Sequence, residues 1–248
     1  MKYIEKLAKD YGIEENAKIR VPVTPGTTLF SFCLLVGSIM FLALRSRPDI
    51  LFSVIYLSQF NTAHNGSHIK ALLQVLQYVM NTRDYSINLS SCVGEKIDVF
   101  TDASWATDLE TCRSFGGHLI YVGGVAVGWG CSKQKSVAAS IMEAEFVTTV
   151  DTLLSFYWLS YIFEKISLLN CVNRLVFHSD SLASIQFTRN DVEKTRSKHI
   201  RVKYAIIREY YEEGLFSLSK IPTEWNVADI FTKWLDGTRL EDLCANIF

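Results

Sequence analysis

Two patterns of apolar and polar residues follow one another along the chain. Up to about residue 90, apolar residues form long runs or recur every three to four positions, as in IKALLQVLQYVMNT, which is typical of a helix with one buried face. MKYIEKLAKDYGI, the apolar run behind a Pro-Thr-Pro-Gly stretch, and RPDILFSVIYLSQF are further helical segments. Residues 1–90 are therefore predicted to be mainly helical.

From about residue 95 the apolar runs become short and are bounded by glycine or acidic residues. KIDVFTDAS, RSFGGHLIYVGG and VAVGWGCS are predicted strands, the last two forming a hairpin, and SIMEAEFVTTVDTLLSFYWLSYIFEKI is a predicted long helix. RLVFHSD and LFSLSKI are the later strands, and SLASIQFTRN, KHIRVKYAIIREYYEE and the closing NVADIFTKWL are helices. This order predicts an α/β fold over residues 95–248, with a mixed sheet covered by helices.

The apolar run Leu29 to Leu44 allows two interpretations, a membrane span or a buried core helix. A span usually needs about 20 apolar residues, and this run is shorter and preceded by Pro22 and Pro25. It also lies too far from Met1, behind acidic residues, to be a secretory signal. We favour a buried helix and expect no membrane partner.

Composition adds limits on compartment and partners. The 248 residues are 49% hydrophobic and 21% charged, enough for two cores, and the net charge of -1 excludes a uniformly basic surface. Any nucleic-acid contact must therefore come from local clusters of Lys and Arg. Six cysteines show neither a CxxC pair nor zinc-ligand spacing, which favours a reducing intracellular compartment: Cys33, Cys92, Cys112, Cys131, Cys171 and Cys244.

Acidic residues stand where predicted elements begin or end. The four that could together form a metal pocket are Asp102, Glu145, Asp180 and Asp229. Asp102 is the hardest to explain otherwise, because strands disfavour Asp and no basic residue is its neighbour in sequence. Hydrolysis of a phosphodiester needs an activated water and a stabilised leaving oxygen, and two Mg²⁺ held by carboxylates supply both. The sequence predicts a metal-dependent nuclease.

Ordinary structural roles compete with that interpretation. Asp180 could cap the helix that begins at Ser181, and Asp229 could pair with Lys233 one turn later. Glu143 fits a capping box with Ser140. The helix that carries Glu143 and Glu145 is apolar around most of its circumference, so its periodicity does not decide between them.

Several motifs together resemble a known family. TDASWATDLETCRSFGG, GWGCSKQKS and SIMEAEF are similar to the RNase H domain of copia-type LTR retrotransposon Pol polyproteins, as are HSDSLASI, TRSKHIRVKYAIIRE and IPTEWNVADIFTK. Upstream, VGSIMFLALRSRPDILFSVIYLSQF and NTRDYSINL resemble the segment that joins reverse transcriptase to RNase H. The resemblance implies a C-terminal reverse transcriptase remnant, thumb- or connection-like, over 1–90. It implies an RNase H-like five-stranded sheet over 95–248.

The resemblance also implies roles for single residues. Asp102 would bridge two Mg²⁺, with Mn²⁺ as the alternative ion, and Asp180 and Asp229 would complete the set. Glu145 is preferred over Glu143 because the family's apolar helix pattern then stays in register. Cellular RNases H have a His before the last Asp, whereas IPTEWNVAD has none. Product release or proton handling is therefore expected to differ, and His199 is not assumed to replace that His.

A basic segment and the hairpin exit are the predicted contacts to an RNA–DNA hybrid. A run of charges is usually a solvated helix face, but these residues are close in sequence to the acids and match the family motif, so we favour backbone binding, which weakens with salt. The predicted nucleic-acid-binding residues are Lys133, Lys135, Lys194, Arg196, Lys198, His199, Arg201 and Lys203.

The Tyr/Phe-x-Asp-Asp motif of a polymerase is absent from the sequence, as are protease and integrase signatures. The expected function is that of a Pol fragment whose RNase H hydrolyses the RNA strand of hybrids, not of a polymerase. The alternative is a non-catalytic relic that at most binds nucleic acid. The expected setting is intracellular, in cytoplasmic virus-like particles and the nucleus, with the element's other Pol and Gag products as partners.

Overall fold

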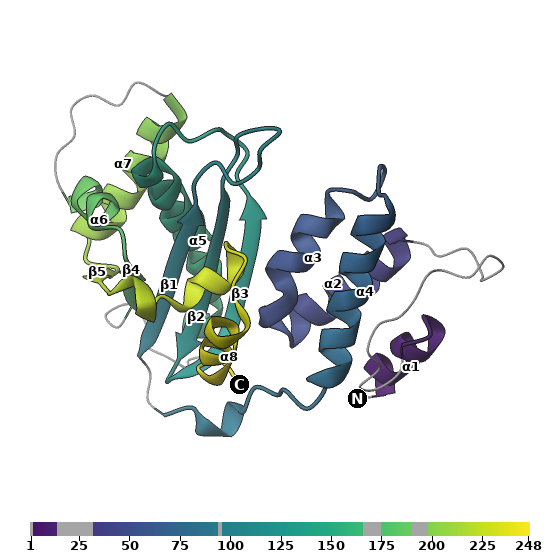
Figure 1. Cartoon of the computed structure of the whole chain (residues 1–248). Coiled ribbons are helices and arrows are strands. Elements are labelled where there is room, and N and C mark those ends of the chain that lie inside the picture. The colour runs from purple at the N-terminus through teal and green to yellow at the C-terminus, as the bar shows by residue number, and fades with distance from the viewer. Residues whose placement is uncertain (1, 14–31, 94–95, 166–174, 190–197) are drawn as a thin grey trace. The chain divides into compact units, whose positions relative to one another are not determined.

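The chain forms two compact units, residues 1–86 and 87–248, in a computed structural model (Figure 1). The structure describes residues 2–13, 32–93, 96–165, 175–189 and 198–248. The predicted contact residues Lys194 and Arg196, and also Cys171, lie outside these ranges.

The first unit is helical. Its helices are α1 (Lys2–Asp10), α2 (Phe32–Arg45), α3 (Leu51–Ser58) and α4 (Gly66–Asn81), with the 3-10 turn η1 (Pro48–Ile50) before α3. Apolar side chains from α2, α3 and α4 are fully buried, among them Leu35, Ile39, Leu51, Leu72 and Leu76. The three-to-four spacing seen in the sequence thus turns one face of each helix into a shared core.

Polar residues fix the ends of these helices. Asn65 caps α4, because its side-chain oxygen accepts the backbone N–H groups of Ser67 and His68, and the His68 ring accepts the Asn65 N–H in return. Between α2 and α3, the buried Arg47 guanidinium pairs with Asp49 at 2.7 Å.

The apolar run of the sequence becomes α2, a helix of 14 residues. Among the described residues, no helix combines the length and the apolar character that crossing a membrane requires. Phe32, Leu35, Val36 and Ile39 of α2 are instead buried.

The second unit is built on one five-stranded sheet. Its strands are β1 (Ile97–Ser104), β2 (Phe115–Val122), β3 (Val125–Lys133), β4 (Leu175–Ser179) and β5 (Ser217–Lys220), in the spatial order β3-β2-β1-β4-β5. The first three strands are antiparallel, and β4 lies parallel to both β1 and β5. The predicted mixed α/β sheet is confirmed.

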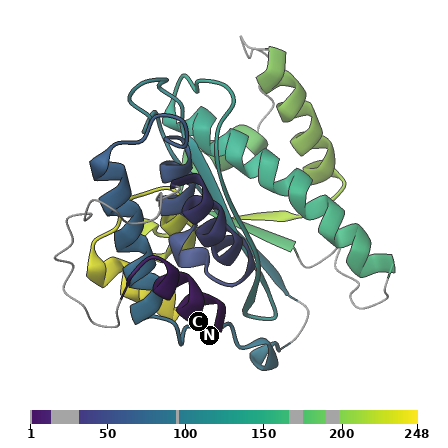
Figure 2. The ribbon, with the colours of Figure 1, turned by 90° about the vertical axis from the view of Figure 1, so that its right-hand side faces the viewer.

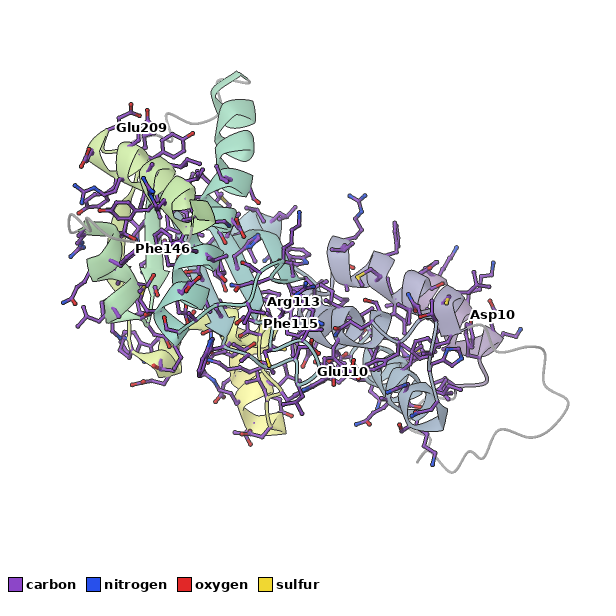
Figure 3. All side chains as sticks on the ribbon, turned by 90° about the horizontal axis from the view of Figure 1, so that it is seen from above. Asp10, Glu110, Arg113, Phe115, Phe146 and Glu209 are labelled. Carbon is purple, nitrogen blue, oxygen red and sulfur yellow. The ribbon has the colours of Figure 1, made fainter. Side chains whose placement is uncertain are left out.

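One face of the sheet is covered by α5 (Ile141–Lys165), with α6 (Leu182–Arg189) and α7 (Lys198–Glu212) packed beside it (Figure 2). Phe146 of α5, labelled in Figure 3, meets Phe187 of α6 edge to face with ring centroids 4.8 Å apart. The core beneath α5 includes Ile97 and Val99 of β1 and Phe177 of β4. These helices therefore hold β1 and β4 rigidly from one side.

The other face of the sheet carries the last part of the chain. Here the prediction of one closing helix, NVADIFTKWL, is wrong. The segment forms a short 3-10 helix, η5 (Val227–Phe231), directly after the 3-10 turn η4 (Thr223–Trp225), and a separate helix α8 (Gly237–Ala245) follows it. A further 3-10 turn, η2 (Leu89–Ser91), precedes β1. The Asn226 side chain accepts the Ala228 N–H and starts η5, which packs on β1 and β2. We attribute the absence of a regular α-helix in this segment to its contact with β1 and β2. The spacing of apolar residues in the sequence gives no information on such a contact.

Candidate metal centre

Two of the predicted acids lie at the carboxyl ends of neighbouring parallel strands. Asp102 is the third residue from the end of β1, and Asp180 follows β4 directly. The strands pair Phe100 with His178, so the two acids, each two residues further on, come level at the same edge of the sheet. Ligands of open α/β sheets bind at such edges.

Glu145 joins them from the first turns of α5. Its Oε1 accepts the backbone N–H of Ala103 at 3.2 Å, which holds the carboxylate over the end of β1. Asp102, Glu145 and Asp180 each offer an oxygen within 4.8 Å of the others, and we call these three residues the acid cluster. Glu143 is held elsewhere, because its carboxylate accepts the Ala139 N–H at 3.1 Å.

Burial makes the acid cluster electrostatically strained. Asp102 is 1% exposed and Glu145 4%, and Glu145 Oε2 is buried without a hydrogen-bond partner. Burial, then the charges of Asp102 and Asp180, raise the pKa of Glu145 to about 9. Burial also raises the pKa of Asp102, although Lys233 opposes the shift. The site is costly in its fully ionised form unless a cation is present.

Asp229, on η5, is engaged by basic groups instead of belonging to the acid cluster. Lys233 Nζ lies 2.6 Å from Asp229 Oδ1 and 3.2 Å from Asp102 Oδ1, and Arg239 Nη2 lies 3.3 Å from Asp229 Oδ2. Burial lowers the pKa of Lys233, but Asp102 and Asp229 outweigh it and the net shift is upward. The Lys233 ammonium is thus a bridge between Asp229 and the acid cluster.

The competing structural roles have different outcomes. Ser181, not Asp180, caps α6, because Ser181 Oγ accepts the Ser184 N–H. Ser140 Oγ accepts the Glu143 N–H as the capping-box interpretation requires, while Glu143 bonds Ala139 rather than Ser140. The Asp229–Lys233 pair forms, but it is one half of the bridge to Asp102.

Three further residues at the site were not singled out by the sequence as members of it. Thr232 Oγ1 donates to Asp102 Oδ2, and the buried Asn226 Nδ2 contacts Asp180 Oδ1 at 3.5 Å and the Thr101 carbonyl at 3.0 Å. Lys233 was considered only as the partner of Asp229. The sequence feature that could have indicated Thr232 and Lys233 is the Thr-Lys pair at the end of the ADIFTK motif, since a set of metal-binding carboxylates does not by itself require these two residues.

The donor set suits a divalent cation. Mg²⁺ prefers oxygen ligands, usually a few carboxylates completed by water and substrate oxygens. The unpartnered Glu145 Oε2 and the mutual repulsion of the acid cluster are the features that a bound cation would relieve. The residues present therefore fit a divalent metal.

Only part of the predicted nucleic-acid contact is described. Lys135 and Arg201 are exposed, Lys133 pairs with Asp108 at 2.5 Å, and Lys203 pairs with Asp151. Lys198 and His199 begin α7, with side chains outside the described set.

Known structures describe the class of fold. No protein-family model matches the chain. The foamy viral protease-reverse transcriptase, solved in complex with dsDNA, is similar with a TM-score of 0.53, over 90% of this chain and 41% of that one at 13% identity. LC11-RNase H1 matches 56% of this chain and 94% of its own at 18% identity, with a TM-score of 0.43. The second unit is an α/β domain with a mixed five-stranded sheet and an acidic centre at the strand ends, and RNase H domains are among the solved structures that it resembles.

Several sequence relatives are Pol polyproteins of transposons. The Pol polyprotein of transposon RE1 from Arabidopsis thaliana is 29% identical over 213 residues, and that of TNT 1-94 from Nicotiana tabacum 31% over 215 residues, each over 86% of this chain. Over most of its length the chain is therefore similar to copia-type retrotransposon Pol polyproteins. It spans only 14% and 16% of these two relatives.

A shorter relative shares part of the chain. Secreted RxLR effector protein 161 from Plasmopara viticola is 35% identical over 125 residues, which are 50% of this chain and 88% of that protein. The shared segment therefore also occurs outside full-length Pol polyproteins.

Proposed function

We propose that the second unit is a metal-dependent ribonuclease H that hydrolyses the RNA strand of RNA–DNA hybrids, leaving 3′-hydroxyl and 5′-phosphate ends. The observation that carries the proposal is the acid cluster, with three carboxylates from β1, α5 and the end of β4 and one buried, unpartnered oxygen. The sequence similarity supports it, since Pol polyproteins are among the relatives.

Asp102, Glu145, Asp180 and Asp229 are the proposed metal-binding and catalytic residues, with Mg²⁺ as the natural ion and Mn²⁺ as a substitute. The bound metal would activate a water and stabilise the leaving oxygen of the phosphodiester. Thr232 orients Asp102, the Ala103 N–H orients Glu145, and Asn226 supports Asp180. Asp180 is the most accessible member of the acid cluster, because Asp102 and Glu145 are buried.

Basic residues on two elements are the proposed hybrid contacts. Lys133 ends β3 and Lys135 follows it, and Arg201 and Lys203 lie on α7, so the proposed phosphate contacts come from two separate elements. The predicted Lys194, Arg196, Lys198 and His199 belong to the same segment of sequence. Binding through such residues weakens steeply as salt is raised, because it releases counterions from the nucleic acid.

The first unit is proposed to be the C-terminal remnant of a reverse transcriptase, connection-like and without a polymerase site. The match of 86% of this chain to RE1, which extends into the helical part, supports this assignment. The proposed setting is the cytoplasmic virus-like particle, and also the nucleus, with other Pol and Gag products as partners.

A cleavage assay tests the function. Purified protein is incubated with a hybrid labelled on either strand, with Mg²⁺ or EDTA, and with single-stranded RNA and duplex DNA as control substrates. We expect cleavage of the hybrid's RNA strand only, with Mg²⁺ only. Asp102→Asn should abolish it, whereas Asp242→Asn, a change at an exposed acid of α8, should not.

The alternative function has a distinct outcome. A folded wild-type protein that binds the hybrid but does not cleave it with Mg²⁺ or Mn²⁺ would be a non-catalytic relic. Cleavage that survives Asp102→Asn would point to a contaminating nuclease and contradict the proposed site.

A further inference from the structure

Lys233 forms ion pairs with two of the four proposed metal-binding acids. Its Nζ lies between two carboxylates, 2.6 Å from Asp229 Oδ1 and 3.2 Å from Asp102 Oδ1. The two acids come from β1 and η5, and their separation is filled by this ammonium group. A cation is therefore already present between Asp102 and Asp229, while Glu145 and Asp180 complete the acid cluster with Asp102.

The two sides of Asp102 differ in what they offer a metal. On the side of Glu145 and Asp180, three carboxylates converge and one oxygen has no partner. On the side of Asp229, both carboxylate oxygens of that residue are in ion pairs, with Lys233 and with Arg239. A metal ion on the second side would have to displace Lys233 or lie against its like charge.

Charge balance leads to the same distinction. The four acids carry four negative charges when ionised, and Lys233 and Arg239 neutralise two of them. One divalent ion then completes the balance, whereas a second would leave an excess of positive charge at a partly buried site. Lys233 is 37% exposed in its side chain, so it can leave when another cation competes for Asp102 and Asp229.

We propose that Lys233 is a built-in cation of this centre, which fills the position between Asp102 and Asp229, so that the resting protein binds one divalent ion, at Asp102, Glu145 and Asp180. The inference rests on the proposed metal centre and deepens it. Lys233 acts as a positioning residue, since it holds Asp229 and Asp102 in register and sets how many ions the site takes.

Direct counting of Mn²⁺ tests the proposal without any reaction. The full chain is titrated with Mn²⁺ alone, and free and bound ion are followed by electron paramagnetic resonance and calorimetry. The wild type should bind one ion per chain. Lys233→Met and Lys233→Gln should bind a second ion at least roughly tenfold more tightly than the wild type does, because the competing charge is gone.

Two variants separate charge from structure. Lys233→Arg keeps the charge and should bind one ion like the wild type. Lys96→Met removes an exposed lysine that pairs with Asp98 at 2.8 Å, away from the centre, and should also leave the count at one. Circular dichroism and thermal unfolding of every variant without metal establish that each is folded.

The outcomes distinguish this inference from the proposed function. A wild type that binds two ions with similar affinity, or neutral variants that bind the second ion no more tightly than the wild type does, overturns the role of Lys233. If hybrid cleavage by the wild type still depends on metal and on Asp102, the proposed function stands. A folded wild type that binds no ion overturns both.

Discussion

At the scale of single residues, the chemistry of the site depends on partners that are distant in sequence. Asp102 has no basic neighbour in sequence, yet Thr232 and Lys233 contact its carboxylate from 130 and 131 residues away. Glu145 and Glu143 are two residues apart and equally acidic, but one reaches Ala103 and the other Ala139. Motif register predicts Glu145 as the metal ligand, and the direction of its side chain toward the end of β1 is compatible with that prediction.

The two glutamates should respond differently to neutral substitution. Burial beside Asp102 raises the pKa of Glu145, so folding near neutral pH must keep this acid protonated at a cost in stability that Glu145→Gln removes. The metal-free variant should therefore unfold at an equal or higher urea concentration than the wild type. The stabilisation that Mg²⁺ adds to the wild type should be lost. Urea unfolding with EDTA and with Mg²⁺ measures both effects.

Glu143→Gln is the matched control. It alters a partly exposed acid of the same helix turn and should keep the full stabilisation by Mg²⁺. The reverse result, with Mg²⁺ stabilisation lost in Glu143→Gln and kept in Glu145→Gln, would show that Glu143 and not Glu145 binds the metal.

A second residue-scale prediction concerns His118 of β2, whose ring lies against Gly130. Burial lowers the pKa of His118 to about 4 from 6.5, so the folded protein keeps it neutral where the unfolded chain takes up a proton. The stability from this group is present above pH 6.5 and is lost as the pH falls to about 4. By the usual conversion it amounts to at most about 3 kcal/mol.

Urea unfolding between pH 7.5 and 4 checks this prediction. His118→Gln should lose less stability on acidification than the wild type, because the substituted residue does not titrate. His64→Gln, a change at an exposed histidine, serves as the control and should follow the wild type. Equal acid sensitivity of the wild type and His118→Gln would contradict the prediction.

At the scale of elements, consecutive glycines of β2 allow two different elements to approach the sheet. A Cβ on Gly116 would meet Thr148 of α5 at 2.4 Å, and one on Gly117 would meet Phe231 of η5 at 2.4 Å. The sequence predicted a glycine-punctuated strand, and the strand is confirmed. Glycine is needed at these two positions because α5 packs on one face of β2 and η5 on the other. The alternation of apolar and polar residues in the sequence does not reveal these two contacts.

Gly117→Ala should therefore displace η5 and disturb the metal centre through Thr232 and Lys233. We expect a loss of about 1–3 kcal/mol in the free energy of unfolding, the usual cost of forcing extra volume into a packed site, and weaker Mn²⁺ binding. Calorimetric titration and urea unfolding measure the two quantities.

Gly128→Ala tests whether any alanine in these strands has the same effect. A Cβ at Gly128 would find its nearest neighbour, Ile120 Cδ1, at 3.5 Å, an ordinary contact. Its stability and Mn²⁺ affinity should stay close to those of the wild type. A Gly117→Ala protein indistinguishable from Gly128→Ala would show that η5 is not held by this contact.

At the scale of the whole molecule, the chain divides into a helical unit, 1–86, and an α/β unit, 87–248. The change of apolar period near residue 90 predicted such a division. The sheet, the helices that cover it and all four acids belong to the second unit. The first unit has its own core and its own buried ion pair between Arg47 and Asp49.

A shortened chain of residues 87–248 should therefore fold and keep the metal centre. We expect cooperative urea unfolding and the same Mn²⁺ count as in the full chain, because every ligand and its supporting contacts are retained. Circular dichroism, unfolding and Mn²⁺ titration check this. A shortened chain that is unfolded, or folded without bound Mn²⁺, would show that residues 1–86 are needed to form the site.

The sequence by itself determined the order of the strands and helices from β1 to β5, the mixed sheet and the resemblance to copia-type Pol polyproteins, because apolar alternation and motifs are local and do not depend on distant contacts. It also pointed to four acids, of which three meet at the strand ends. The tertiary structure alone decided that η5 is a 3-10 turn, that Ser181 is the cap of α6, and that Lys233 bridges Asp102 and Asp229. The bridge depends on contact between residues more than 100 positions apart, and no local pattern encodes such contacts.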